Sequence, residues 1–181
     1  MIRERMMPQA ELVASEKELL AELAARNLYM VIGGQSNPSA GRLPTDVLLA
    51  GLVQHEEARL HLALIALLLY QPETVTAIPT ALRHLTLTQQ TSLKLFYTAA
   101  VLLQQMHESP LRQYLSHWQP LPDLFAASLG LDETAVPQVQ LHQLSNRHRE
   151  LSGVRANWFG SYQYAAERLL TRLAKETAWA A

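Results

Sequence analysis

The chain has 181 residues, of which 49% are hydrophobic, and its 15 Lys and Arg nearly balance its 16 Asp and Glu. This apolar content excludes a wholly disordered chain, and the near-neutral charge argues against a general polyanion binder. The absence of cysteine excludes disulfides and thiolate metal sites. A chain of this length typically forms one folded unit, so we expect residues 1–181 to be a single domain.

The first predicted element is a helix that begins near Pro8 and runs towards Ile32, with its leucines on one stripe. Proline is favourable in the first turn of a helix because its missing N–H would have no partner there. Gly, Ser, Asn and Pro then gather in residues 33–43, and each of these residue types favours turns. We therefore predict a loop at 33–43.

Residues 43–71 and 78–107 share a pattern at an offset of about 35 residues. In each segment a proline, Pro44 or Pro79, opens a short helix, and a longer leucine-rich helix follows a turn. A third copy is predicted at 121–151 when one residue is omitted from the alignment. A period of this size is typical of stacked helical hairpins, because one hairpin cannot bury its apolar face alone.

In this period and in the proline-started first helices, the segments resemble HEAT-type repeats. That resemblance implies a stack of helical hairpins, while an irregular helical bundle would give the same leucine pattern. Further helices are predicted at about 137–151 and 157–177, and no segment alternates as a β-strand does. The predicted fold class is an all-α domain of about eight helices.

The middle of the chain is poor in charge. Between Leu60 and His107 the charged residues are only Glu73, Arg83 and Lys94. Because a solvated helix face normally carries charge, we expect this stretch in the core, with a surface covered by a partner as the alternative. Its longest apolar run, Leu62–Tyr70, is too short to span a bilayer, and the first residues lack the apolar core of a signal peptide. We therefore predict a cytoplasmic protein that does not bind membranes.

Glu57 and His61 are the nearest approach to a metal site. They lie four positions apart in the sequence, so they would share one face of a helix. A working zinc or di-iron site needs three or four converging ligands, and the usual HExxH and paired ExxH spacings are missing. The sequence therefore predicts neither a metal nor a cofactor, and we interpret both residues as structural or solvent-facing.

Arg112 and His117 form an Arg-x4-His pattern. This pattern is similar to the catalytic motif of HEPN-type ribonucleases, and the resemblance implies that the histidine transfers a proton while the arginine stabilises a pentacovalent phosphate. Gln113 stands where that family usually has Asn, Asp or His, and Pro110 and Pro120 confine the motif to a short helix. The alternative is a surface arginine beside a partly buried histidine.

Basic and aromatic residues alternate between positions 142 and 164. The candidate binding residues are Arg147, Arg149, Arg155, Trp158, Phe159 and Tyr162. Arginine and aromatic side chains dominate protein-interface hot spots, and they equally suit single-stranded nucleic acid, where guanidinium groups meet phosphates and rings stack on bases. The helical spacing of Trp158 and Tyr162 offers a third interpretation, packing of the last helix against the core.

These patterns favour a non-enzymatic protein–protein interaction protein: a scaffold, accessory subunit or regulator of a larger complex, of bacterial type. Its expected partner is another protein or a second copy of itself. The alternative is a nucleic-acid-associated helical subunit or antitoxin-like regulator. A HEPN-like, metal-independent ribonuclease is the third hypothesis.

Overall fold

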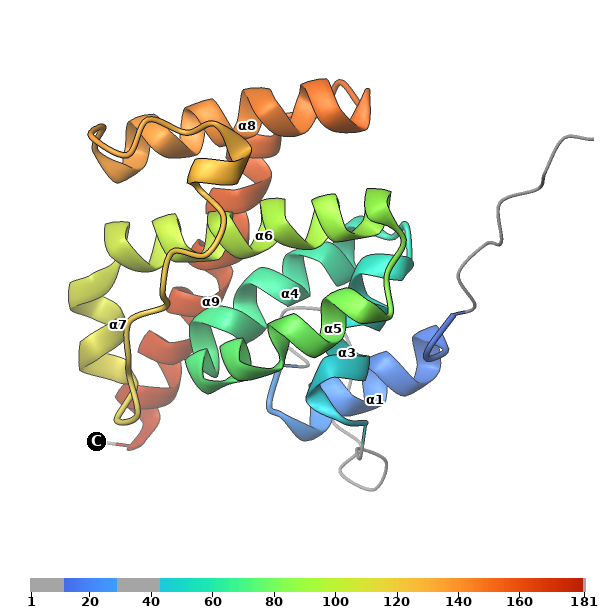
Figure 1. The fold of residues 1–181 in the computed structure, drawn as a ribbon. Helices are drawn as coiled ribbons and strands as arrows, with labels where there is room; N and C mark the ends of the chain where they lie inside the picture. Colours follow the sequence, from blue (N-terminus) through green and yellow to red (C-terminus); the bar gives the residue numbers. More distant parts are fainter. Residues whose placement is uncertain (1–11, 29–42, 181) are drawn as a thin grey trace, which may run out of the picture.

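The computed structural model describes residues 12–28 and 43–180, which form eight α-helices, two short 3-10 helices and no strand (Figure 1). This confirms the predicted all-α class. In chain order the elements are α1 (Glu16–Ala25), α3 (Thr45–Gln54), α4 (Ala58–Tyr70), η1 (Pro72–Ala77), α5 (Ile78–Arg83), α6 (Leu87–Met106), α7 (Glu108–Tyr114), η2 (Ala127–Leu129), α8 (Pro137–Ser152) and α9 (Trp158–Ala180).

Helix α1 is set by local signals at its two ends. The Ser15 hydroxyl accepts a hydrogen bond from the backbone N–H of Glu18, whose carboxylate accepts one from the Ser15 N–H at 2.8 Å. This capping box satisfies two N–H groups that the helix leaves unpaired. Asn27 follows the helix with a left-handed φ of 61°, which stops it. The helix is therefore shorter than predicted, because residues 12–15 before it and 26–28 after it are not helical. The predicted ends near Pro8 and Ile32 themselves, and all of the predicted loop at 33–43 except residue 43, lie outside the described residues.

Two helical hairpins occupy the segments predicted at 43–71 and 78–107. Helix α3 turns back into α4, and α5 turns back into α6; α4 packs against α6 while α3 packs against α5 (Figure 1). Helix α4 ends before Pro72, at the end of the first predicted segment, because a residue that precedes proline is disfavoured in the helical conformation. The assignment of these hairpins to HEAT-type repeats stays a prediction.

Two details depart from what residue type and the predicted third copy suggest. In that copy, predicted at 121–151, the only helix between 121 and 136 is the single turn η2, which ends at Gly130 in the left-handed conformation (φ 73°) that glycine adopts at a helix C-cap. Helix α7 begins at Glu108, so Ser109, a good N-cap by residue type, lies inside the helix and Pro110 is its third residue. Proline is tolerated there because first-turn N–H groups have no partner within the helix.

The core is built around α4 and α6. Helix α4 contacts α3, α6 and α9, and its residues from Ala63 to Leu69 are at most 1% exposed. Helix α6 is buried from Leu95 to Gln104 and lies between α4 and α8. This placement confirms the core position for α4 and most of α6 in the charge-poor middle of the chain, whereas Leu87 at the start of α6 is exposed. Among the described residues no single helix is both long and apolar enough to cross a membrane, and the one bent pair that passes by length and composition, Ala58–Tyr70 with Pro72–Arg83, turns by 113°.

The segment after α7 is tied to α6 by a buried amide. Gln104 is 3% exposed; its Nε2 donates to the carbonyl of Gln119 at 2.9 Å, and its Oε1 accepts from the N–H of Leu121 at 2.7 Å. About two turns earlier on α6, the Tyr97 hydroxyl donates a hydrogen bond to the carbonyl of Pro122 at 2.7 Å. These three bonds hold a segment without helix against the core.

Replacing Gln104 by leucine is expected to lower the free energy of unfolding by about 2 kcal/mol, because the N–H of Leu121 and the carbonyl of Gln119 lose their partner. Urea denaturation measures this loss. The matched control is Gln105→Leu at the exposed neighbouring position, which we expect to change stability by less than about 0.5 kcal/mol. Equal losses in the two variants would contradict the role of this amide.

Candidate binding groove between α6 and α8

Arg112 and His117 each have a structural partner. The Arg112 guanidinium pairs with Glu108 at 2.7 Å and lies over the Trp118 ring, 4.0 Å from its centroid. Nε2 of His117 lies 3.0 Å from the carbonyl oxygen of Tyr70. These contacts give both side chains a role in holding the segment after α7, and the ribonuclease hypothesis stays a prediction.

Glu57 and His61 face different partners. The Glu57 carboxylate accepts from Nε of Arg59 at 2.7 Å, whereas the His61 ring lies against Phe96 with 4.8 Å between centroids. In the part of the chain that the structure describes, no group of three or more His, Asp or Glu gathers as a metal site would require.

The predicted aromatic residues dock α9 onto α8. Trp158 stacks on His148 and Phe159 stacks on His142, each pair with 3.7 Å between centroids and 8° between ring planes. Tyr162 is fully buried. Arg147 is exposed and pairs with Glu150 at 3.1 Å. The rings therefore have a packing role, whatever else they contact.

Arg149 and Arg155 are placed differently from Arg147. Both side chains are exposed, and within the described residues neither forms an ion pair. Arg149 lies in the last turn of α8 and Arg155 in the loop that leads to α9, and with Ala156 and Asn157 they line one shallow depression. Two guanidinium groups are thus available on one side of the α8–α9 loop.

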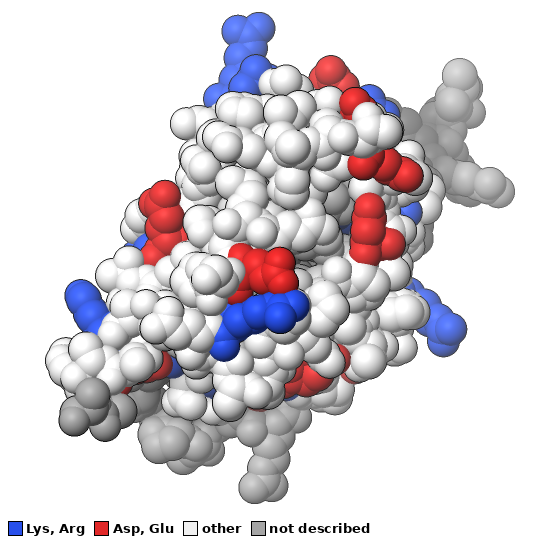
Figure 2. Space-filling view, turned by 90° about the vertical axis from the view of Figure 1, so that its left-hand side faces the viewer, with Lys and Arg blue, Asp and Glu red and all other residues white. Residues whose placement is uncertain are grey.

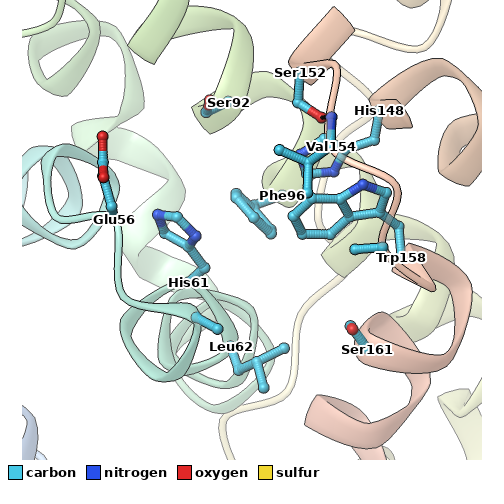
Figure 3. Close-up of a pocket in the computed structure, with 12 residues that line it drawn as sticks. Glu56, His61, Leu62, Ser92, Phe96, His148, Ser152, Val154, Trp158 and Ser161 are labelled. Atoms are coloured by element: carbon cyan, nitrogen blue, oxygen red, sulfur yellow. Dashed lines mark hydrogen bonds between the residues drawn. The ribbon is translucent and has the colours of Figure 1, made fainter. Parts of the chain in front are cut away.

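A cavity of about 590 Å³ lies beside this loop (Figure 3). It is lined by residues from the α3–α4 turn, the start of α4, the first half of α6, the end of α8, the α8–α9 loop and the start of α9. They are Glu56, Ala58, His61, Leu62, Ser92, Phe96, His148, Ser152, Val154, Ala156, Trp158 and Ser161. Figure 3 shows Glu56 and His61 on one side, Val154 and Trp158 on the other, and Phe96 between them.

A second hollow of about 360 Å³ continues the first along α6 and α8. The two share Ser92, His148 and Ser152, so they form one groove, here called the α6/α8 groove. Three large apolar side chains stand along it in water: Leu87 is 80% exposed, Val154 52% and Leu151 43%. The groove is therefore apolar both in its floor and along its edge.

The two histidines of the groove are held in the neutral form. Burial, and to a smaller extent the neighbouring His61, lowers the pKa of His148 to about 4, and burial also lowers the pKa of His61. Nδ1 of His148 lies 2.6 Å from the Tyr162 hydroxyl, whose own pKa is raised by burial. At neutral pH the charge in the cavity wall is therefore that of Glu56.

The hydroxyl groups of the three serines in the cavity each form a hydrogen bond with the backbone. The hydroxyls of Ser92 and Ser161 donate to carbonyls one turn earlier, at 3.3 Å and 3.1 Å, and the Ser152 hydroxyl accepts from the N–H of Val154 at 3.2 Å. No hydrogen bond between these serines and a histidine is found among the described residues. An activated nucleophile needs an adjacent base, so this geometry suits binding better than covalent catalysis.

Sequence reasoning located one wall of this groove and missed the other. The predicted basic and aromatic run contributes Trp158 to the groove, and Arg149 and Arg155 to the depression beside it. Phe96 and Leu87 come from α6 and carry no local mark of function. Comparison of the chain with protein-family models, curated proteins and solved structures gives no significant match. The chemistry of the groove therefore carries the functional argument.

Proposed function

We propose that this protein is a non-enzymatic interaction protein, acting as a scaffold, accessory subunit or regulator, that binds a segment of a partner protein in the α6/α8 groove. The observation that carries the proposal is the gathering of Leu87, Leu151 and Val154 around one apolar groove. Contiguous exposed apolar surface with a polar surround is typical of an interaction site, because covering it removes that surface from water.

The groove is suited to hold apolar side chains. Its floor is Phe96, which is 1% exposed and locked by rings on α8 and α9. A wall that is already packed loses little freedom when a partner binds, so more of the contact energy appears as affinity. Its volume of about 590 Å³ lies in the range of sites that enclose a ligand or the anchor side chains of a partner.

A protein segment fits this surface better than single-stranded nucleic acid does. Stacking platforms need open ring faces, but Trp158 and Phe159 each have one face covered by a histidine, and Tyr162 is buried. On the side of the molecule that carries α7, which Figure 2 shows, Lys and Arg are scattered and some adjoin acidic residues, without a basic patch. A polyanion groove would concentrate positive charge along the path of the backbone.

The test is a selection of random peptides displayed on phage against the whole protein. We expect apolar peptides to be enriched and to bind the double variant Leu87→Glu, Val154→Glu about tenfold or more weakly, because each carboxylate would have to be buried under the peptide. The matched control is Val136→Glu with Val139→Glu, two valines that are 63% and 46% exposed at the other end of α8. This control should bind as the original protein does.

Peptides that bind both double variants equally well would overturn the proposal, and so would a selection that enriches no peptide. A single-stranded oligonucleotide measured in parallel gives the competing result. Salt-sensitive oligonucleotide binding that is lost in Arg149→Glu, Arg155→Glu, without any groove-dependent peptide, would replace the protein partner by a nucleic acid.

A further inference from the structure

We infer that the partner segment binds the α6/α8 groove in one fixed direction. It has an apolar anchor, an acidic side chain on the side of Arg149 and Arg155, and a basic side chain on the side of Glu56. The inference rests on the proposed function and names the chemistry of the partner. It is carried by the position of the charges at the two sides of the cavity.

The first side carries two arginines without counter-charges. Ala156 lines both the main cavity and the depression that Arg149 and Arg155 share, so the two arginines lie next to the cavity. In contrast, the nearby Arg147 is neutralised by Glu150. A guanidinium presents donors in a planar fork that matches a carboxylate, and two of them in one place favour an anionic group.

The opposite side carries a carboxylate. Glu56 lines the cavity across from Val154 and Trp158 (Figure 3) and forms no ion pair among the described residues. Its neighbour Glu57 differs, because Arg59 neutralises it. Like charges brought together across an interface repel, so an acidic residue of the partner is disfavoured here and a basic residue is favoured.

The middle of the cavity is apolar and uncharged. Leu62, Phe96 and Trp158 line it. His61 and His148 are neutral at physiological pH because burial disfavours their charged forms. A charged group of the partner would lose its hydration here without gaining a counter-charge. The partner's charges are thereby confined to the two ends, and the two ends have opposite preferences, which sets the direction of the segment.

The experiment exchanges the charge at each side of the cavity separately. A peptide enriched on the original protein is resynthesised with its acidic residues replaced by lysine, and both peptides are titrated against the original protein and against Arg149→Glu, Arg155→Glu. We expect the acidic peptide to lose about tenfold or more in affinity on the variant and the lysine peptide to regain it. Glu56→Lys should weaken binding of the original peptide in the same way, and a peptide whose basic residue is replaced by glutamate should regain the affinity on this variant.

The matched control is Arg83→Glu, an exposed arginine at the end of α5, which should leave both peptides unaffected. All these positions are exposed, and circular dichroism checks that each variant is folded. Peptides that depend on Leu87 and Val154 but show no charge preference would overturn this inference and leave the proposed function intact. Peptides that ignore Leu87 and Val154 would overturn the proposed function itself, and the inference with it.

Discussion

Replacing Phe96 by alanine is expected to lower the free energy of unfolding by about 3–5 kcal/mol, the usual range for a buried phenylalanine. Phe96 is 1% exposed and joins three helices at the floor of the groove. Its ring lies 4.8 Å from His61, 5.2 Å from His148 and 6.2 Å from both Trp158 and Tyr162, measured between centroids. The truncation removes buried area and these ring contacts together.

Urea denaturation at neutral pH measures this effect. Tyr164→Ala on α9 is the matched control, because this ring is 49% exposed and its removal should cost less than about 1 kcal/mol. Leu87→Ala should be nearly neutral for stability while weakening peptide binding, since Leu87 is 80% exposed. A loss below about 1.5 kcal/mol for Phe96→Ala would show that the floor of the groove is not the packed centre described here.

Lowering the pH from 7 to 5 is expected to destabilise the fold by about 2 kcal/mol through His148 alone. An exposed imidazole in the unfolded chain has a pKa near 6.5, while the pKa of His148 in the fold is about 4. Between these values the unfolded chain binds the proton and the fold does not, so stability falls as the pH falls. The loss approaches about 3 kcal/mol near pH 4, and His61 adds to it in the same direction.

Urea denaturation at pH 7 and pH 5 tests this prediction, because most carboxylates stay ionised over that interval. His148→Gln removes the titrating group, so the variant should lose less stability between the two pH values than the original protein does. The control Asn146→Gln changes an exposed side chain on the same helix that carries no titratable group, so it should keep the original pH dependence. An unchanged pH dependence in His148→Gln would contradict the assignment.

Most of the fold could be predicted because its signals are local. Prolines near the helix starts and the leucine stripes placed the first two hairpins within 43–71 and 78–107, and placed α8 and α9 close to their observed bounds. The start of α7 could not be placed this way, because Ser109 is a good N-cap by type but lies inside the helix. There the chain passes from α6 into α7 through the single residue His107, so α7 begins directly after α6 ends.

The groove could be predicted only in part. Arg149, Arg155 and Trp158 are close in sequence, so their composition is visible without a structure. Phe96 and Glu56 come from helices and loops much earlier in the chain, and only the packing of α6 against α8 and of α4 against α9 brings them to the same cavity. A single sequence carries no signal for such a non-local meeting of surfaces.

The most direct test of the groove uses the absence of cysteine from the chain. A single cysteine is introduced at Val154, or at Val136 as the control, and its alkylation rate is measured with and without a saturating peptide from the selection. The account predicts that the peptide slows alkylation at position 154 about tenfold or more and leaves position 136 unchanged, because only the first lies under the bound segment. Equal rates at position 154 with and without peptide, or equal slowing at both positions, would contradict it.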